Sequence, residues 1–125
     1  MPISMYQASI PVFIHMLGNL RNILAKGAAY ATAKNFDATI LVNSRLAPDM
    51  FALARQVQIA TDMVKGCAAR LAGVEPPKYE DTETTIDELI ARVDKTISFL
   101  KEFSPTQIDN TEDKAITLAL RTRTL

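Results

Sequence analysis

The sequence predicts an all-α protein that folds as a single domain over residues 1–125. Three segments repeat apolar residues at the three-and-four spacing of a buried helix face. Prolines and capping residues separate these segments, as is usual between helices. The length of 125 residues fits one domain, and a hydrophobic fraction of 48% is enough for a core that buries about two thirds of the unfolded surface.

Composition excludes several classes of function. The 14 basic and 14 acidic side chains cancel, so no net charge favours binding to nucleic acid or to an anionic membrane. No apolar run approaches the ~18 residues of a transmembrane helix, and the opening segment lacks the basic start of a signal peptide. We therefore expect a bacterial cytoplasmic protein. A single Cys and a single His exclude an intramolecular disulfide and any site that needs two histidines from one chain.

The first helix is expected over residues 5–33, with Leu17, Leu24 and Ala31 on its buried stripe. His15 falls on the opposite, polar stripe. Pro11 sits too early to break this helix, and it marks either the first turn or a kink. A short helical turn is predicted over residues 38–44.

The central helix is predicted from Leu46 to Gly73. Pro48 and Asp49 suit the first turn of a helix, and Gly73 suits its end. About 24 residues at ~1.5 Å each would make a helix of roughly 36 Å. Apolar side chains, Met63 among them, cover more than half of its circumference. A helix this apolar must be covered on two sides, so we expect a homo-oligomer, specifically a homodimer.

An acidic linker over residues 75–84 leads to a third helix, capped by Thr84 or Thr85 with an acid three positions later. Ser104 and Pro105 start one further turn that ends near Asn110. From Ile116 to Arg121 apolar and polar residues alternate, which predicts a strand. A lone strand is not stable, so it would pair with another copy of the chain or with a segment outside this one.

Four polar side chains are the candidate pocket-lining residues: His15, Arg55, Gln58 and Asp62. A lone imidazole could act as a general base, although a surface or bundle role for His15 is the simpler interpretation. Arg55, Gln58, Asp62 and Lys65 share one face of the central helix. That face could line a cavity, but a solvated face carrying an Asp62–Lys65 pair is the favoured interpretation.

The sequence predicts no metal site and no cofactor. A carboxylate-bridged di-metal bundle needs Glu-x-x-His motifs, which are absent, and the four glycines form no phosphate-binding loop. The acidic linker lacks the glycine and the ligand spacing of a calcium loop. Cys67 lies among apolar residues and is expected to be an inert packing residue.

Three stretches carry a family resemblance: "SMYQASIPVFIHMLGNL", "NSRLAPDMFALARQVQIATDMVKGCAARLAG" and "YEDTETTIDELIARVDKTISFL". Together they resemble an uncharacterised bacterial family, a domain of unknown function within the DinB/YfiT-like superfamily. The resemblance runs from Met5 to about Leu120. It implies a four-helix up-down-down-up bundle, often dimeric, in a superfamily described as metal-dependent enzymes that include thiol-dependent transferases.

Two departures limit what the resemblance implies. The superfamily's usual metal site takes one His from its second helix and two from its last helix. In place of the first, this sequence has Gln58, a poor ligand for transition metals. Relatives also continue past Leu125, so we expect three main helices, a C-terminal strand and no final helix. The groove formed by Phe13, Leu17, Val57, Val64 and Ile97 would then be open on one side.

The prediction is therefore a DinB-like bundle protein of unknown biochemical function that forms a homodimer and holds no metal. Two alternatives stay open: a small-molecule-binding bundle, and a metal- or thiol-dependent transferase or hydrolase of the superfamily type. Whether the protein is an enzyme is left undecided.

Overall fold

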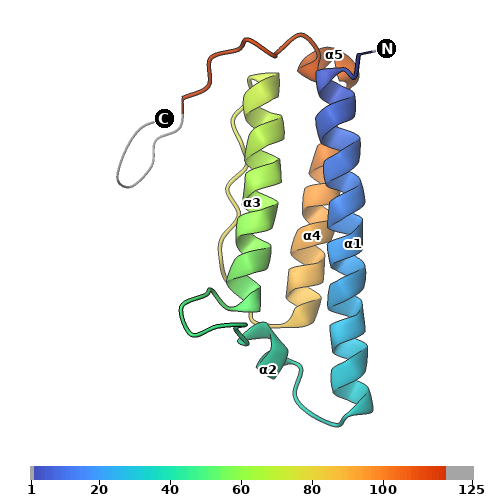
Figure 1. Ribbon diagram of the computed structural model, residues 1–125, viewed down its shortest axis with the longest axis vertical. Helices are drawn as coiled ribbons and strands as arrows, with labels where there is room; N and C mark the ends of the chain where they lie inside the picture. The colour runs from blue at the N-terminus through green and yellow to red at the C-terminus, as the bar shows by residue number, and fades with distance from the viewer. Residues whose placement is uncertain (1, 118–125) are drawn as a thin grey trace.

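The computed structural model describes residues 2–117, and all regular secondary structure in that range is helical. The all-α prediction is therefore confirmed. The helices are α1 (Met5–Ala33), α2 (Thr39–Val42), α3 (Leu53–Ala72), α4 (Ile86–Lys101) and α5 (Pro105–Ile108). The three long helices lie side by side, with α1 antiparallel to both α3 and α4 (Figure 1). The short α2 and α5 lie at opposite ends of this bundle, as Figure 1 shows.

The start of α1 is set by a capping box at Ser4. The Ser4 hydroxyl accepts from the Gln7 backbone N–H at 3.1 Å, and the Gln7 side chain accepts from the Ser4 N–H at 3.2 Å. Pro11 thus lies inside the helix, beyond its first turn. At the same end of the bundle, the Asp109 carboxylate accepts from the Tyr6 N–H at 3.0 Å. A carboxylate in this position stabilises both the unpaired N–H and the positive end of the helix dipole.

The central helix α3 begins at Leu53, so the predicted start at Leu46 is wrong. Residues 43–52 form a loop instead, in which Pro48 occupies a turn closed by the Met50 N–H and the Ala47 carbonyl at 3.0 Å. The Leu53 N–H then donates to the Ser44 carbonyl, also at 3.0 Å, which directs the chain into α3. With 20 residues, α3 is about 30 Å long.

The end of α3 matches the prediction. Gly73 takes the left-handed conformation with φ of 75°, and the Val74 N–H returns to the Ala69 carbonyl at 2.9 Å. A glycine is favoured at this position because a Cβ would be strained there.

An extended strap, residues 74–84, runs back along the length of α3 and allows α4 to start at the same end of the bundle (Figure 1). Eleven extended residues can reach about 36 Å, which is enough to span the roughly 30 Å of α3. Of the two predicted caps, Thr85 is the one used, because its hydroxyl accepts from the Glu88 N–H at 3.1 Å. The backbone N–H of Thr84 and the hydroxyls of Thr84 and Thr85 donate to the Glu88 carboxylate and lower the pKa of Glu88.

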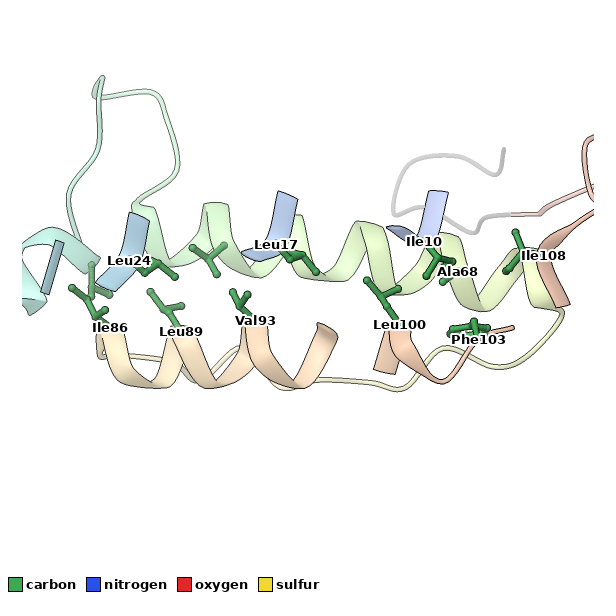
Figure 2. Close-up of a cluster of buried hydrophobic side chains, with 12 residues drawn as sticks. Ile10, Leu17, Leu24, Ala68, Ile86, Leu89, Val93, Leu100, Phe103 and Ile108 are labelled. Carbon is green, nitrogen blue, oxygen red and sulfur yellow. The ribbon is translucent and has the colours of Figure 1, made fainter. Parts of the chain in front are cut away.

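The core lies between α1, α3 and α4, with α5 closing one end (Figure 2). Leu17 of α1 and Val57 of α3 are almost fully buried, and so they do not line an open groove as predicted. Phe13, Val64 and Ile97 are only partly buried. Large apolar side chains are instead exposed elsewhere on the same helices, notably Met16 at 57% and Met63 at 69%.

The two short helices agree with the sequence, since α2 falls within residues 38–44 and α5 follows Ser104. The predicted C-terminal strand lies mostly outside the described residues, and its first two positions, Ile116 and Thr117, have no regular structure. Within residues 2–117, no helix is both long and apolar enough to cross a membrane.

Candidate functional site

The polar face of α3 is organised by Arg92, a residue of α4 whose side chain is only 2% exposed. Its Nε donates to the Thr61 hydroxyl at 2.7 Å, and Nη2 donates to the Asp62 carboxylate at 2.7 Å and the Gln58 carbonyl at 3.5 Å. Its Nη1 donates to the Glu80 carbonyl at 3.1 Å and the Glu83 carboxylate at 3.0 Å. These are five hydrogen bonds, and a guanidinium has five N–H groups, so every donor of Arg92 has an acceptor.

Three carboxylates surround this guanidinium. Besides Asp62 and Glu83, Asp81 lies 3.1 Å from Nη1 of Arg92. Gln58 donates to the same Glu83 oxygen at 3.1 Å, and Lys65 pairs with Asp62 at 3.1 Å. We call this set the Arg92 cluster: Gln58, Thr61, Asp62, Lys65, Asp81, Glu83 and Arg92. Two of its acids belong to the strap, so the cluster fastens the strap to α3 and α4.

Tyr79 of the strap adds an aromatic contact to the cluster. The Nζ atoms of Lys65 and Lys95 lie 4.0 and 4.1 Å from its ring centroid, and the Arg92 guanidinium carbon lies 5.5 Å away. Cations over a tyrosine ring are attracted to its negative face. Burial is the main cause that raises the pKa of Tyr79, so its hydroxyl is neutral near pH 7. A shallow hollow of about 360 Å³ lies beside Tyr79, Asp62 and Lys65.

The prediction that this face of α3 is solvated is therefore wrong for Gln58 and Lys65. Gln58 and Lys65 are both 6% exposed because the strap covers them. Arg92 is not among the residues predicted from the sequence, although a signal for it exists. It lies on the buried stripe of α4, between Leu89 and Thr96, and shortly after the acidic linker that supplies its partners.

The remaining candidate residues lie outside this arrangement or at its edge. Arg55 is about half exposed and pairs with Asp81 at 2.9 Å. His15 is exposed on α1 and does not join Gln58 or Asp62 at a common site. None of Arg55, Gln58 and His15 lines the apolar groove beside α2, which is described below. Whether they bind a ligand stays a prediction.

The residues present do not fit the three-His metal set that the superfamily implies. Gln58 uses its amide to donate to Glu83, and His15 points from the exposed side of α1. Within residues 2–117, no group of three His, Cys, Asp or Glu side chains is placed to hold a metal ion. Cys67 is a free thiol on α3, and burial raises its pKa, which is the opposite of activation.

An apolar groove of about 500 Å³ lies at the other end of α3, where α2 and the loop over residues 43–52 meet α1. Leu24 and Ile86 form its buried base, and Leu46 and Phe51 stand at its rim. Ser44, Arg45 and Gln56 supply its polar groups. The sequence predicts that Leu46 and Phe51 belong to the central helix, which is wrong. They line the groove because α3 starts later.

The arrangement of helices is similar to one solved by crystallography. A DinB family member protein from Shewanella denitrificans superposes with a TM-score of 0.81 and 38% sequence identity over 94% of this chain. The described helices thus define a DinB-like helical protein.

The particular family is shown by sequence. The chain belongs to the family described as Domain of unknown function (DUF1993), which matches residues 5–125. The predicted family is therefore confirmed. This chain spans 66% of the length of the Shewanella denitrificans protein. No curated protein matches it.

Proposed function

We propose that this DinB-like protein works as a self-associating helical bundle without a bound metal, and that its functional form is a homodimer. In this proposal α1, α3 and α4 are three helices of an up-down-down-up four-helix bundle. Helices of a second copy cover the side where a fourth helix would pack. A cytoplasmic location in a bacterium, and a C-terminal strand from Ile116 onwards, stay predictions.

The observation that carries this proposal is an exposed apolar face shared by α1 and α3. On α1, the exposed side chains Val12, Met16 and Ile23 follow helical spacing along one side. On α3, Met63 lies two turns after Gln56. Because Ile23 and Gln56 line the same groove, Met63 lies on the same side of the molecule as the exposed residues of α1. We call this set the open face: Val12, Met16, Ile23 and Met63.

Exposed apolar side chains gathered on one side of a protein indicate an association surface. A dimer through this face would remove Met16 and Met63 from water without disturbing the Arg92 cluster, which lies on the strap side of α3.

Light scattering after size exclusion, with metal analysis of the same peak, tests the proposal. The expected result is a dimer without stoichiometric metal. The double variant Met16→Glu/Met63→Glu should be monomeric, whereas Ser98→Glu, on the exposed side of α4, should remain dimeric. A wild-type monomer at micromolar concentration contradicts the proposal, and so does a dimer that survives the double variant.

The enzyme alternative needs ligands that one His and one Cys per chain cannot supply alone. One metal ion per chain in the analysed peak would favour that alternative, with ligands shared between subunits. The small-molecule alternative has a specific observation in its favour, the groove beside α2, although its residues differ from those expected from sequence.

A further inference from the structure

The groove beside α2 has the dimensions of a small-molecule site. Its volume of about 500 Å³ lies within the range of roughly 300–1,000 Å³ that is usual for ligand pockets. Leu24 and Ile86 close it from below, and both are buried. Its rim is unusually apolar, because Leu46 is 93% exposed and Phe51 is 58% exposed.

The loop that forms the rim is held by its own hydrogen bonds. The Met50 N–H donates to the Ala47 carbonyl and the Leu53 N–H donates to the Ser44 carbonyl, each at 3.0 Å. Nη1 of Arg45 donates to the Met50 carbonyl at 3.3 Å. The groove is therefore preformed, so a ligand does not have to order the loop when it binds.

Gly27 keeps the groove open on the α1 side. A Cβ at this position would lie 3.5 Å from Leu41 and 3.9 Å from Ile86, both residues that line the groove. A methyl group is thus tolerated, but a longer side chain would extend into the ligand space. Gly18, on the same helix, has no atom within 4 Å of its own Cβ position and lies outside the groove. It offers a matched control.

The charge at the groove comes from Arg45. Within residues 2–117 it forms no ion pair, and its hydrogen bond goes to a neutral carbonyl. Asp49, on the same loop, is not paired with it. By contrast, Arg21, Arg55 and Arg92 each pair with a carboxylate. A guanidinium beside an apolar surface is suited to a planar carboxylate, which it can bind with two parallel hydrogen bonds.

We propose that this groove binds a small amphipathic carboxylate, with its apolar body along Leu24, Phe51 and Ile86 and its carboxylate on Arg45. A neutral apolar ligand would fill the groove but leave the guanidinium without an anion. A cationic ligand would be repelled. This inference does not rest on the homodimer. Ile23 belongs to both the open face and the groove, but Arg45 and Phe51, which would hold the ligand, are not part of the open face.

The methionines allow a site-specific test. Met50 lines the groove, whereas Met16 and Met63 do not. Full-length protein labelled with ¹³C at the methionine methyl groups would be titrated with decanoate, decanol and decyltrimethylammonium below their micelle concentrations. We expect decanoate to shift the Met50 methyl signal and to leave Met16 and Met63 unchanged. Decanol should bind about tenfold to a hundredfold more weakly, which is the effect of a charged hydrogen bond.

Two variants separate the head group from the apolar body. Arg45→Gln should reduce decanoate affinity at least about tenfold and leave decanol affinity unchanged. Gly27→Leu should abolish the Met50 shift with both ligands, whereas Gly18→Leu should preserve it. Circular dichroism would verify that each variant folds.

Four results would overturn the proposal. They are equal binding of decanol and decanoate, preferred binding of the cation, shifts at Met16 instead of Met50, and no Met50 shift with millimolar decanoate. A Met50 shift that depends only on protein concentration would mean that a second copy occupies the groove. Repeating the titration in Met16→Glu/Met63→Glu keeps this test separate from that of the dimer.

Discussion

Replacing Arg92 with methionine tests whether the strap is held by the buried ion cluster. Methionine keeps the apolar stem but removes all five hydrogen bonds. Breaking a buried ion pair by removing one partner usually costs about 3–5 kcal/mol, because the other charge is left unpaired. The affected carboxylates differ here: Glu83 is only 14% exposed, whereas Asp62 and Asp81 are about 40% exposed and keep partners in Lys65 and Arg55.

The loss should therefore lie near the lower limit, at about 3 kcal/mol. For a domain of this size, that corresponds to a decrease in Tm of roughly 10–15 °C. Arg55→Met is the matched control, because Arg55 contacts the same Asp81 from a half-exposed position. That variant should lose at most about 1 kcal/mol, the usual worth of a surface ion pair.

Urea denaturation followed by circular dichroism would measure both losses. If Arg92→Met loses less than about 1 kcal/mol, or no more than Arg55→Met, the cluster does not hold the strap. The double variant Arg92→Met/Glu83→Gln separates the causes. It should recover part of the stability, because it removes the buried carboxylate that the single variant leaves unpaired.

Further predictions follow from other parts of the fold. Gln58→Ala should lower the free energy of unfolding by about 1–2 kcal/mol, because Glu83 loses a buried donor. His15→Ala, at an exposed position, should change the free energy of unfolding by at most about 0.5 kcal/mol. Equal losses for the two variants in urea denaturation would contradict this difference. Val57→Asp places an unpaired charge in the core, and a cooperative thermal transition near that of the wild type would be inconsistent with its burial. Gly73→Ala should cost about 1 kcal/mol, since alanine is strained at a φ of 75°, and an unchanged urea midpoint would argue against that conformation. Because the pKa of Glu88 is lowered, its stabilisation is present above the unfolded pKa of about 4.5 and is lost as the pH falls through the lower folded pKa. Glu88→Ala should therefore be less stable than wild type at pH 7, and this difference should shrink as the solution is acidified. A difference that does not change with pH would show that ionisation of Glu88 contributes nothing.

The sequence alone predicted those features that depend on nearby residues. The spacing of Leu17, Leu24 and Ala31 marks a helix face whatever covers it, and Gly73 ends α3 through its own backbone conformation. The capping box that starts α4 needs only residues three positions apart. For the same reason the short helices α2 and α5 were found.

Features set by contacts between distant residues could not be read in this way. The start of α3 at Leu53 depends on the hydrogen bond from the Leu53 N–H to the Ser44 carbonyl. The loop between these two residues is as rich in apolar side chains as a helix, so its sequence does not reveal that it is a loop. The burial of Gln58 depends on the strap, which lies some 25 residues further along the chain.

The all-α class and most of the helices can be read from the amino acids alone, because periodicity and capping act within a few residues. The family follows from the resemblance of three longer stretches. Helix packing, by contrast, places Arg92 among three carboxylates on a covered face and brings Arg45 and Phe51 to α1 at a groove. In both cases the charge or apolar surface of one segment is completed by segments far away in the chain. Only packing of the helices brings such partners together.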